Sequence, residues 1–282
     1  MGQYDITVKY LAQKHPLPYL QLVLPGFRGS YRVLPKHLPV LETEIDFLIE
    51  VTLDGETFIL HPDFQTRFEY GMPRRMLDYR VHITHIYGKP VLSVVIWMTE
   101  EDYPGPGRNR LVETVAGREQ LTFEFLEVRL WELDPQPVLA AGETALLPLV
   151  PLMGKPSEDV LRRAVALADT VPDEEERADI YTGISVLGGL RYSRGLVRSM
   201  IRSEQMSRSV IYDEIVEEGA LRARRIDIVA ALEERVGSVP EDLPSRLDSL
   251  EDSVELSRLH RLAVRCDTLE EFLSGMEPAA AR

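Results

Sequence analysis

The sequence lacks several features that would assign it to a familiar class. Its 282 residues include one cysteine, Cys266, which excludes an internal disulfide and a cysteine-based zinc site. The longest apolar run, Val91–Met98, is interrupted by Ser93 and is far shorter than the roughly 20 residues of a membrane helix. The N-terminus has neither a basic leader nor an apolar signal core. We therefore expect a cytoplasmic protein that does not associate with membranes.

The sequence also has fewer positively than negatively charged residues. The chain has 32 Lys and Arg against 46 Asp and Glu, which gives a net charge of −14. Phosphate backbones repel an acidic chain, so any binding of DNA requires local basic patches or metal ions. With 44% apolar residues, the chain is otherwise typical of a globular protein that buries a core.

The two halves of the sequence differ in their pattern. Residues up to about 135 mix helix and strand signals, whereas the chain beyond Pro148 has helical spacing throughout. The pattern predicts an α/β fold with a mixed sheet in residues 1–150 and a helical region in 151–282. The expected strands are 44–53, 57–65, 91–98 and 121–133. The expected helices are 4–11, 73–87, 158–169, 174–188, 194–204, 210–236, 243–250, 253–264 and 269–276.

The most informative segment is the hairpin at residues 42–67. Asp54-Gly55 is a strong signal for a two-residue turn, and a turn there makes opposed residue numbers sum to 109. Ile45 then faces Phe64, and Phe47, Ile49 and Val51 face Pro62, Leu60 and Phe58. One face of the hairpin is therefore apolar on both strands, as a sheet packed against a core requires.

The same register places Asp46 opposite Asp63 on the other face, and Glu44 opposite Gln65. Two facing carboxylates must be solvated, share a proton or hold a cation between them. Asp, Asp and Gln together are oxygen donors that suit Mg²⁺ or Mn²⁺. The competing interpretation is the solvated face of an edge hairpin, where acidic residues discourage aggregation. His61 lies one pair away, opposite Leu48, and is more readily explained as structural than as a general base.

Several segments resemble the Rpn family of recombination-promoting nucleases and transposases, a branch of the PD-(D/E)XK phosphodiesterase superfamily. The resemblance depends on the order and spacing of these segments and covers nearly the whole chain. They are YDITVKYL (4–11), EIDFLIEV (44–51), HPDFQTR (61–67), YGMPRRMLDYR (70–80), PVLSVVIW (90–97), VRLWELDP (128–135), ETALLPLVPLM (143–153), LGGLRYSRGLVRSMIRSEQM (187–206) and IYDEIVEEG (211–219).

The resemblance implies a restriction-endonuclease-like core and a set of site residues. Asp46 and Asp63 match the two acidic positions that hold the divalent metal, and Asp5 lies where many members place a further acidic ligand. Gln65 stands where the superfamily usually has Lys, a replacement that this branch shares. Asp63 stands where the branch has Glu, so its carboxylate reaches about one methylene less far.

The expected activity is Mg²⁺-dependent endonucleolytic hydrolysis of double-stranded DNA, with Mn²⁺ or Ca²⁺ as alternative ions. Gln65 would orient the attacking water but cannot act as a general base near neutral pH. The expected DNA contacts are Lys9, Arg67, Arg75, Tyr79 and a stripe of Arg194, Arg198 and Arg202 at i,i+4 spacing on one helix. A homodimer would supply the two active sites that a double-strand cut needs.

Two other interpretations stay open. An inactive nuclease fold could bind DNA or protein without using the Asp pair. Alternatively, an acidic metal-dependent phosphoesterase could act on small substrates, which the net charge of −14 favours. His82 and His85 have a spacing that suits a metal, but no third ligand lies near them in the sequence, and we interpret them as a helix surface.

Overall fold

The computed structural model describes residues 3–34, 45, 47–101, 103–115 and 117–276, apart from the side chain of Asp5. The chain forms two compact units, Met1–Tyr212 and Asp213–Arg282. The boundary expected at residue 150 therefore falls inside the first unit. Each unit has its own apolar core, and the candidate site belongs to the first.

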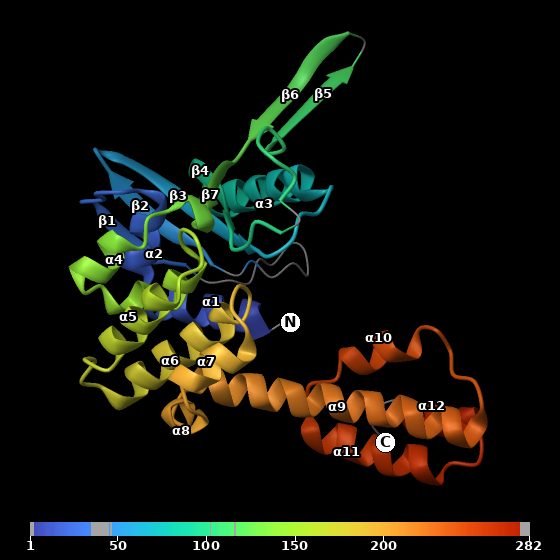
Figure 1. Ribbon diagram of the computed structural model, residues 1–282. Coiled ribbons are helices and arrows are strands. Elements are labelled where there is room, and N and C mark those ends of the chain that lie inside the picture. The colour runs from blue at the N-terminus through green and yellow to red at the C-terminus, as the bar shows by residue number, and fades with distance from the viewer. Residues whose placement is uncertain (1–2, 35–44, 46, 102, 116, 277–282) are drawn as a thin grey trace. The chain divides into compact units, whose positions relative to one another are not determined.

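The first unit is built on a five-stranded mixed sheet with strand order β1-β2-β3-β4-β7 (Figure 1). Strands β1, β2 and β3 run antiparallel, whereas β3, β4 and β7 run parallel. The expected mixed α/β class is confirmed. The strands are β1 Ser30–Val33, β2 Ile49–Leu53, β3 Glu56–Gln65, β4 Val91–Trp97 and β7 Leu126–Arg129.

The β2–β3 hairpin has the predicted register. Ile49 pairs with Leu60 and Leu53 pairs with Glu56 across the turn. Asp54 and Gly55 have φ angles of 51° and 85°, the left-handed conformations that a tight hairpin turn requires. Local turn chemistry therefore fixes this part of the sheet.

The predicted first strand of this hairpin is too long. Strand β2 begins at Ile49 rather than at residue 44, and its ladder with β3 ends at Ile49 opposite Leu60. Ile45 and Leu48 pack into the same apolar core, although strict alternation would place them on opposite faces. The carbonyl of Leu48 accepts a hydrogen bond of 3.0 Å from the backbone N–H of Leu34. Leu48 is therefore bonded to the residue that follows β1 rather than to β3.

Helix α3 (Met72–Tyr87) connects the parallel strands β3 and β4 and packs against one face of the sheet. It was predicted closely, because Pro73 fits the first turn and Gly88 ends it with a φ of 61°. Two helices precede the sheet, α1 (Gln3–Lys14) and α2 (Pro16–Val23). Tyr19 of α2 contacts the ring of Phe64 at 6.1 Å. The central strand β3 is thus covered on both sides.

Residues near 150 are core rather than linker. Residues 145–152 of the 3₁₀ segment η2 (Thr144–Leu152) are all buried, and this segment packs against α5 (Glu158–Ala168) and α6 (Glu174–Gly188). α6 also packs against α1. The helices that follow residue 150 therefore contribute to the core of the first unit.

The strand predicted at 121–133 is divided in the structure. Its first part belongs to β6 (Arg118–Glu124), which pairs with β5 (Arg110–Val115) in a separate two-stranded hairpin that extends beyond α3 in Figure 1. The strand is interrupted at Phe125. The backbone N–H of Phe125 donates to the carbonyl of Asn109 at 3.1 Å, and the carbonyl of Phe125 accepts from Nδ2 of Asn109 at 2.8 Å. Strand β7, the 3₁₀ segment η1 (Leu130–Glu132) and α4 (Gln136–Ala141) follow.

The β5–β6 hairpin contains an irregularity. Glu113 pairs with Leu121, but the next residue, Thr114, pairs with Glu119, so Gln120 is an extra residue in β6. Such a bulge increases the local twist of the ribbon. Within the described residues, no third strand pairs with this hairpin.

The second unit is helical. Leu221, Ile228, Leu232, Leu259 and Phe272 are among its buried apolar residues, and its core includes the only cysteine, Cys266. The helices are α9 (Val210–Val236), α10 (Leu243–Asp248), α11 (Ser253–Arg265) and α12 (Leu269–Met276). Among the described residues of the whole chain, no helix combines the length and apolarity needed to cross a bilayer.

Candidate active site

Asp63 lies near the carboxyl end of β3, on the face that packs against α3. It is 8% exposed, and its Cα partner on the neighbouring strand β4 is Val95. The Nε2 of Gln65 donates to Oδ2 of Asp63 at 2.7 Å, and Nη2 of Arg75 donates to the same oxygen at 3.1 Å. The sequence predicted that Asp63 and Gln65 share a face, and the fold adds Arg75 to them.

Arg75 links this carboxylate to a second one. Its Nη1 donates to Oε2 of Glu69 at 2.6 Å, while Nη2 reaches Asp63. Burial lowers the pKa of Arg75, but Asp63 and Glu69 outweigh that effect and raise it above its ordinary value. The guanidinium is therefore a permanent positive charge at the site. Glu69 was not expected from the sequence, because an exposed Glu in a loop has no distinguishing pattern.

His61 is a buried neutral imidazole beneath the same site. It is 2% exposed, and its ring meets the ring of Tyr79 edge-on at 5.3 Å. Burial, and next the charge of Arg75, lower the pKa of His61 to about 3. An imidazole with that pKa is uncharged near neutrality and is too weak a base to take up a second proton there, which argues against His61 as a general acid or base. Its Nδ1 and the Oγ of Ser93, its partner on β4, are buried without a hydrogen-bond partner among the described residues.

Two predicted ligands lie outside the described residues. Asp46 is one, and the side chain of Asp5 is the other, so the opposition of Asp46 and Asp63 stays a prediction. Within the described part of the chain, no three His, Cys, Asp or Glu side chains gather as a group that could hold a metal. The carboxylate of Asp63 and the amide of Gln65 are oxygen donors of the kind that Mg²⁺ prefers. A metal centre here therefore requires Asp46, Asp5 or both to complete it.

The other expected DNA contacts are distributed over the first unit. Lys9 is half-buried in α1, Arg67 is exposed two residues after the end of β3, and Tyr79 packs against His61 from α3. Arg67 lies close in sequence to Gln65 and is exposed at the same end of β3. Tyr79 is engaged with the buried histidine, which gives it a structural role.

The predicted arginine stripe is not on one helix. α7 (Arg194–Met200) ends before Arg202, and α8 begins anew at Ser203 and runs to Met206. Ile201 leaves the helix in an extended conformation and is 2% exposed in the core of the first unit. Arg194 and Arg198 remain exposed one turn apart, whereas Arg202 lies beyond the break. Burial of the Ile201 side chain thus overrides the helical periodicity that suggested the stripe.

His82 and His85 lie along α3 as predicted for a helix surface. His85 is exposed, and Nδ1 of His82 lies 2.6 Å from the backbone carbonyl of Asp78 one turn earlier. They bring no further ligand to Asp63.

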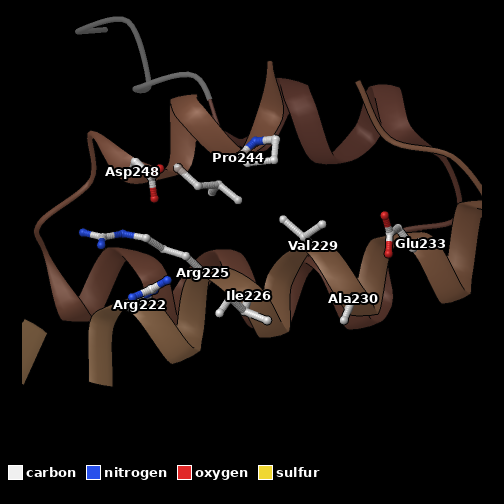
Figure 2. Close-up of a pocket in the computed structure, with 9 residues that line it drawn as sticks. Arg222, Arg225, Ile226, Val229, Ala230, Glu233, Pro244 and Asp248 are labelled. Atoms are coloured by element: carbon white, nitrogen blue, oxygen red, sulfur yellow. The ribbon is translucent and has the colours of Figure 1, made fainter. Parts of the chain in front are cut away.

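A groove of about 370 Å³ lies in the second unit, between α9 and α10 (Figure 2). Arg225, which is 7% exposed, donates from Nη2 to the carbonyl of Leu250 at 2.8 Å and so ties α9 to the end of α10. None of the predicted site residues lines this groove. Its lining is formed by Arg222, Arg225, Ile226, Val229, Ala230, Glu233, Pro244, Leu247 and Asp248.

Comparison with known proteins adds no relative to this description. No family model, no curated protein and no solved structure matches the chain.

Proposed function

We propose that the chain is a metal-dependent DNA endonuclease of the recombination-promoting type, with a restriction-endonuclease-like core and Asp63 at its active site. The observation that carries the proposal is the nearly buried carboxylate of Asp63, oriented by Gln65 and Arg75 at the carboxyl end of β3. Burying a charged carboxylate costs free energy, and a strand end that opens onto loops is a common place for catalytic groups.

The residues divide the expected work in a definite way. Asp63, with Asp46 and Asp5, would hold Mg²⁺, and the ion would supply positive charge to the scissile phosphate and acidify the attacking water. Gln65 fixes the orientation of the Asp63 carboxylate through its Nε2 donor. Arg75 adds a permanent positive charge beside that carboxylate, which suits contact with a phosphate oxygen. Double-stranded DNA as substrate and a homodimer as the cutting unit remain parts of this proposal.

A plasmid-nicking assay with Mg²⁺, Mn²⁺, Ca²⁺ or EDTA tests the activity. We expect cutting by the wild type with Mg²⁺ or Mn²⁺ and none with EDTA, and we expect Asp63→Asn to abolish it. Asp54→Asn is the matched control, because it removes one carboxylate from the same hairpin at a turn position that Asn also tolerates. Equal cutting by Asp63→Asn and wild type would contradict the assignment of the site.

One observation favours the alternative of an inactive binding module. Arg75 and Gln65 already satisfy the Asp63 carboxylate by hydrogen bonds, so its burial does not by itself require a metal. Thermal unfolding with and without Mn²⁺ separates the two functions. An active site should bind the ion and raise the melting temperature of the wild type but not of Asp63→Asn. Equal melting temperatures with and without Mn²⁺ in the wild type would favour the inactive module.

A further inference from the structure

Five aromatic rings form a continuous row beside Asp63, which we call the aromatic row. Tyr70 contacts Phe68 at 5.3 Å, Phe68 contacts Trp97 at 6.2 Å, and Trp97 contacts Tyr103 at 5.5 Å. Trp131 completes the row at 5.3 Å from Tyr103. Both tryptophans of the chain belong to it.

The row begins at the candidate site. Trp97 is the Cα partner of Gln65 on the neighbouring strand β4. Tyr70 directly follows Glu69, the residue whose carboxylate accepts from Arg75. The backbone carbonyl of Gln65 also accepts a hydrogen bond of 2.8 Å from the N–H of Met98, which holds the ends of β3 and β4 together. The aromatic row and the Asp63 carboxylate therefore share one end of the sheet.

The inner rings have a structural explanation, but Tyr70 does not. Trp97 is 1% exposed and donates from Nε1 to Glu127 at 2.9 Å, while Phe68, Tyr103 and Trp131 are half-buried. Tyr70 is 91% exposed, although its ring touches Phe68. An exposed aromatic ring that is supported from one side is a surface on which another flat ring can stack.

We propose that Tyr70 stacks against an unpaired nucleobase of the DNA that the Asp63 site acts on. This inference rests on the proposed function and names its substrate class, which is double-stranded DNA that has unpaired bases next to the cleaved bond. Base stacking on aromatic side chains is the general means of holding single strands and is independent of base sequence.

The charge of the protein favours contact with such locally unpaired bases over extended contact with fully paired DNA. The net charge is −14, and Glu100 and Glu101 lie shortly after Trp97 in the loop that leaves β4. In extended contact, the phosphates of two DNA backbones would be repelled by these carboxylates, whereas stacking of a base on a ring does not depend on charge. Arg75 and Arg67 then need to neutralise only a few phosphates near the site. The affinity should accordingly fall only shallowly with salt.

Binding of the full-length protein to oligo-dT and to a duplex of equal length tests the proposal. Fluorescence anisotropy is measured in EDTA, so that no cleavage occurs, and quenching of tryptophan emission is followed in parallel. We expect oligo-dT to bind more tightly than the duplex and to quench the emission. Tyr70→Ala should weaken binding of oligo-dT about tenfold or more, while Tyr70→Phe should stay within about twofold of the wild type. Tyr31→Ala, at another exposed tyrosine, should have no effect.

The outcomes distinguish this inference from the nuclease proposal. Absence of oligo-dT binding, or equal affinity of wild type and Tyr70→Ala, would overturn the stacking role. If Asp63→Asn abolishes plasmid nicking while Tyr70→Ala binds oligo-dT normally, only the stacking inference fails. If Tyr70→Ala loses oligo-dT binding while Asp63→Asn cuts like the wild type, only the catalytic assignment fails.

Discussion

Arg75 is the residue on which the candidate site most depends. Its side chain is 29% exposed and pairs with Asp63, whose side chain is 11% exposed. We expect Arg75→Ala to lower the free energy of unfolding by about 1–3 kcal/mol, because it leaves a nearly buried carboxylate without its charged partner. Urea unfolding measures the loss. The neighbouring Arg74→Ala removes a more exposed pair with Glu113 and should cost less than about 1 kcal/mol. Equal losses would contradict the buried role of Arg75.

His61 gives the stability a pH dependence. The pKa of His61 is about 3 in the folded state, below the ordinary 6.5 of an unfolded chain, so the unfolded state binds the proton more readily. The stability that the neutral imidazole provides is therefore full above pH 6.5 and is lost as the pH falls toward 3. Between pH 7 and pH 5 we expect a loss of about 2 kcal/mol that His61→Gln does not show. Urea titrations of wild type and His61→Gln at the two pH values measure this difference. Equal losses of stability in the two proteins would contradict the low pKa of His61.

At the scale of elements, the sequence predicts those parts of the fold that local chemistry determines. The Asp54-Gly55 turn fixes the β2–β3 register, and the Pro73 and Gly88 signals bound α3. β1 was not predicted, because it has only four residues and lies in a stretch rich in Pro and Gly, and it becomes a strand by pairing with β2. The break at Ile201 was missed for a related reason, since it depends on a core that forms from distant helices.

The candidate site was predictable to the same extent. Asp63 and Gln65 follow from strand alternation, whereas the burial of His61 does not. The sequence suggested a polar outer face, but α3 packs over it and removes His61 from solvent. The crossover between two parallel strands was the available signal, because its helix must cover one face of the sheet.

Gly183 of α6 packs closely against Pro148 and Leu11, and this close packing can be tested by substitution. A Cβ at Gly183 would lie 2.8 Å from Cβ of Pro148 and 3.0 Å from Leu11, both in buried positions. We expect Gly183→Ala to destabilise the first unit by about 1–3 kcal/mol through overpacking. Gly188→Ala in the same helix meets no atom nearer than 3.7 Å and should be neutral or slightly stabilising. Thermal unfolding followed by tryptophan fluorescence compares the two, and a harmless Gly183→Ala would contradict the close approach.

At the scale of the whole molecule, the two units carry separate reporters. Trp97 and Trp131 both lie in the first unit, whereas Cys266 is buried in the core of the second. We expect the tryptophan emission and the reactivity of the thiol to report different transitions along a urea gradient, because the two cores are distinct. Leu259→Ala, in the second core, should lower the free energy of unfolding of the second unit by about 2–5 kcal/mol. Cys266 should then react with thiol reagents at a lower urea concentration, while the fluorescence transition stays where it is. Coincident transitions would show that the units unfold as one.

The extra residue in the β5–β6 hairpin has a consequence for solubility. A two-stranded ribbon presents two unpaired edges, and Val112 and Val115 are 44% and 62% exposed on it. Such a ribbon invites edge-to-edge pairing between molecules, but the Gln120 bulge twists the ladder away from the flat form that pairing needs. Deleting Gln120 would straighten the ribbon, and we expect light scattering of the variant to rise with concentration where the wild type stays clear. We therefore expect one irregular residue to protect a ribbon with exposed valines from intermolecular strand pairing.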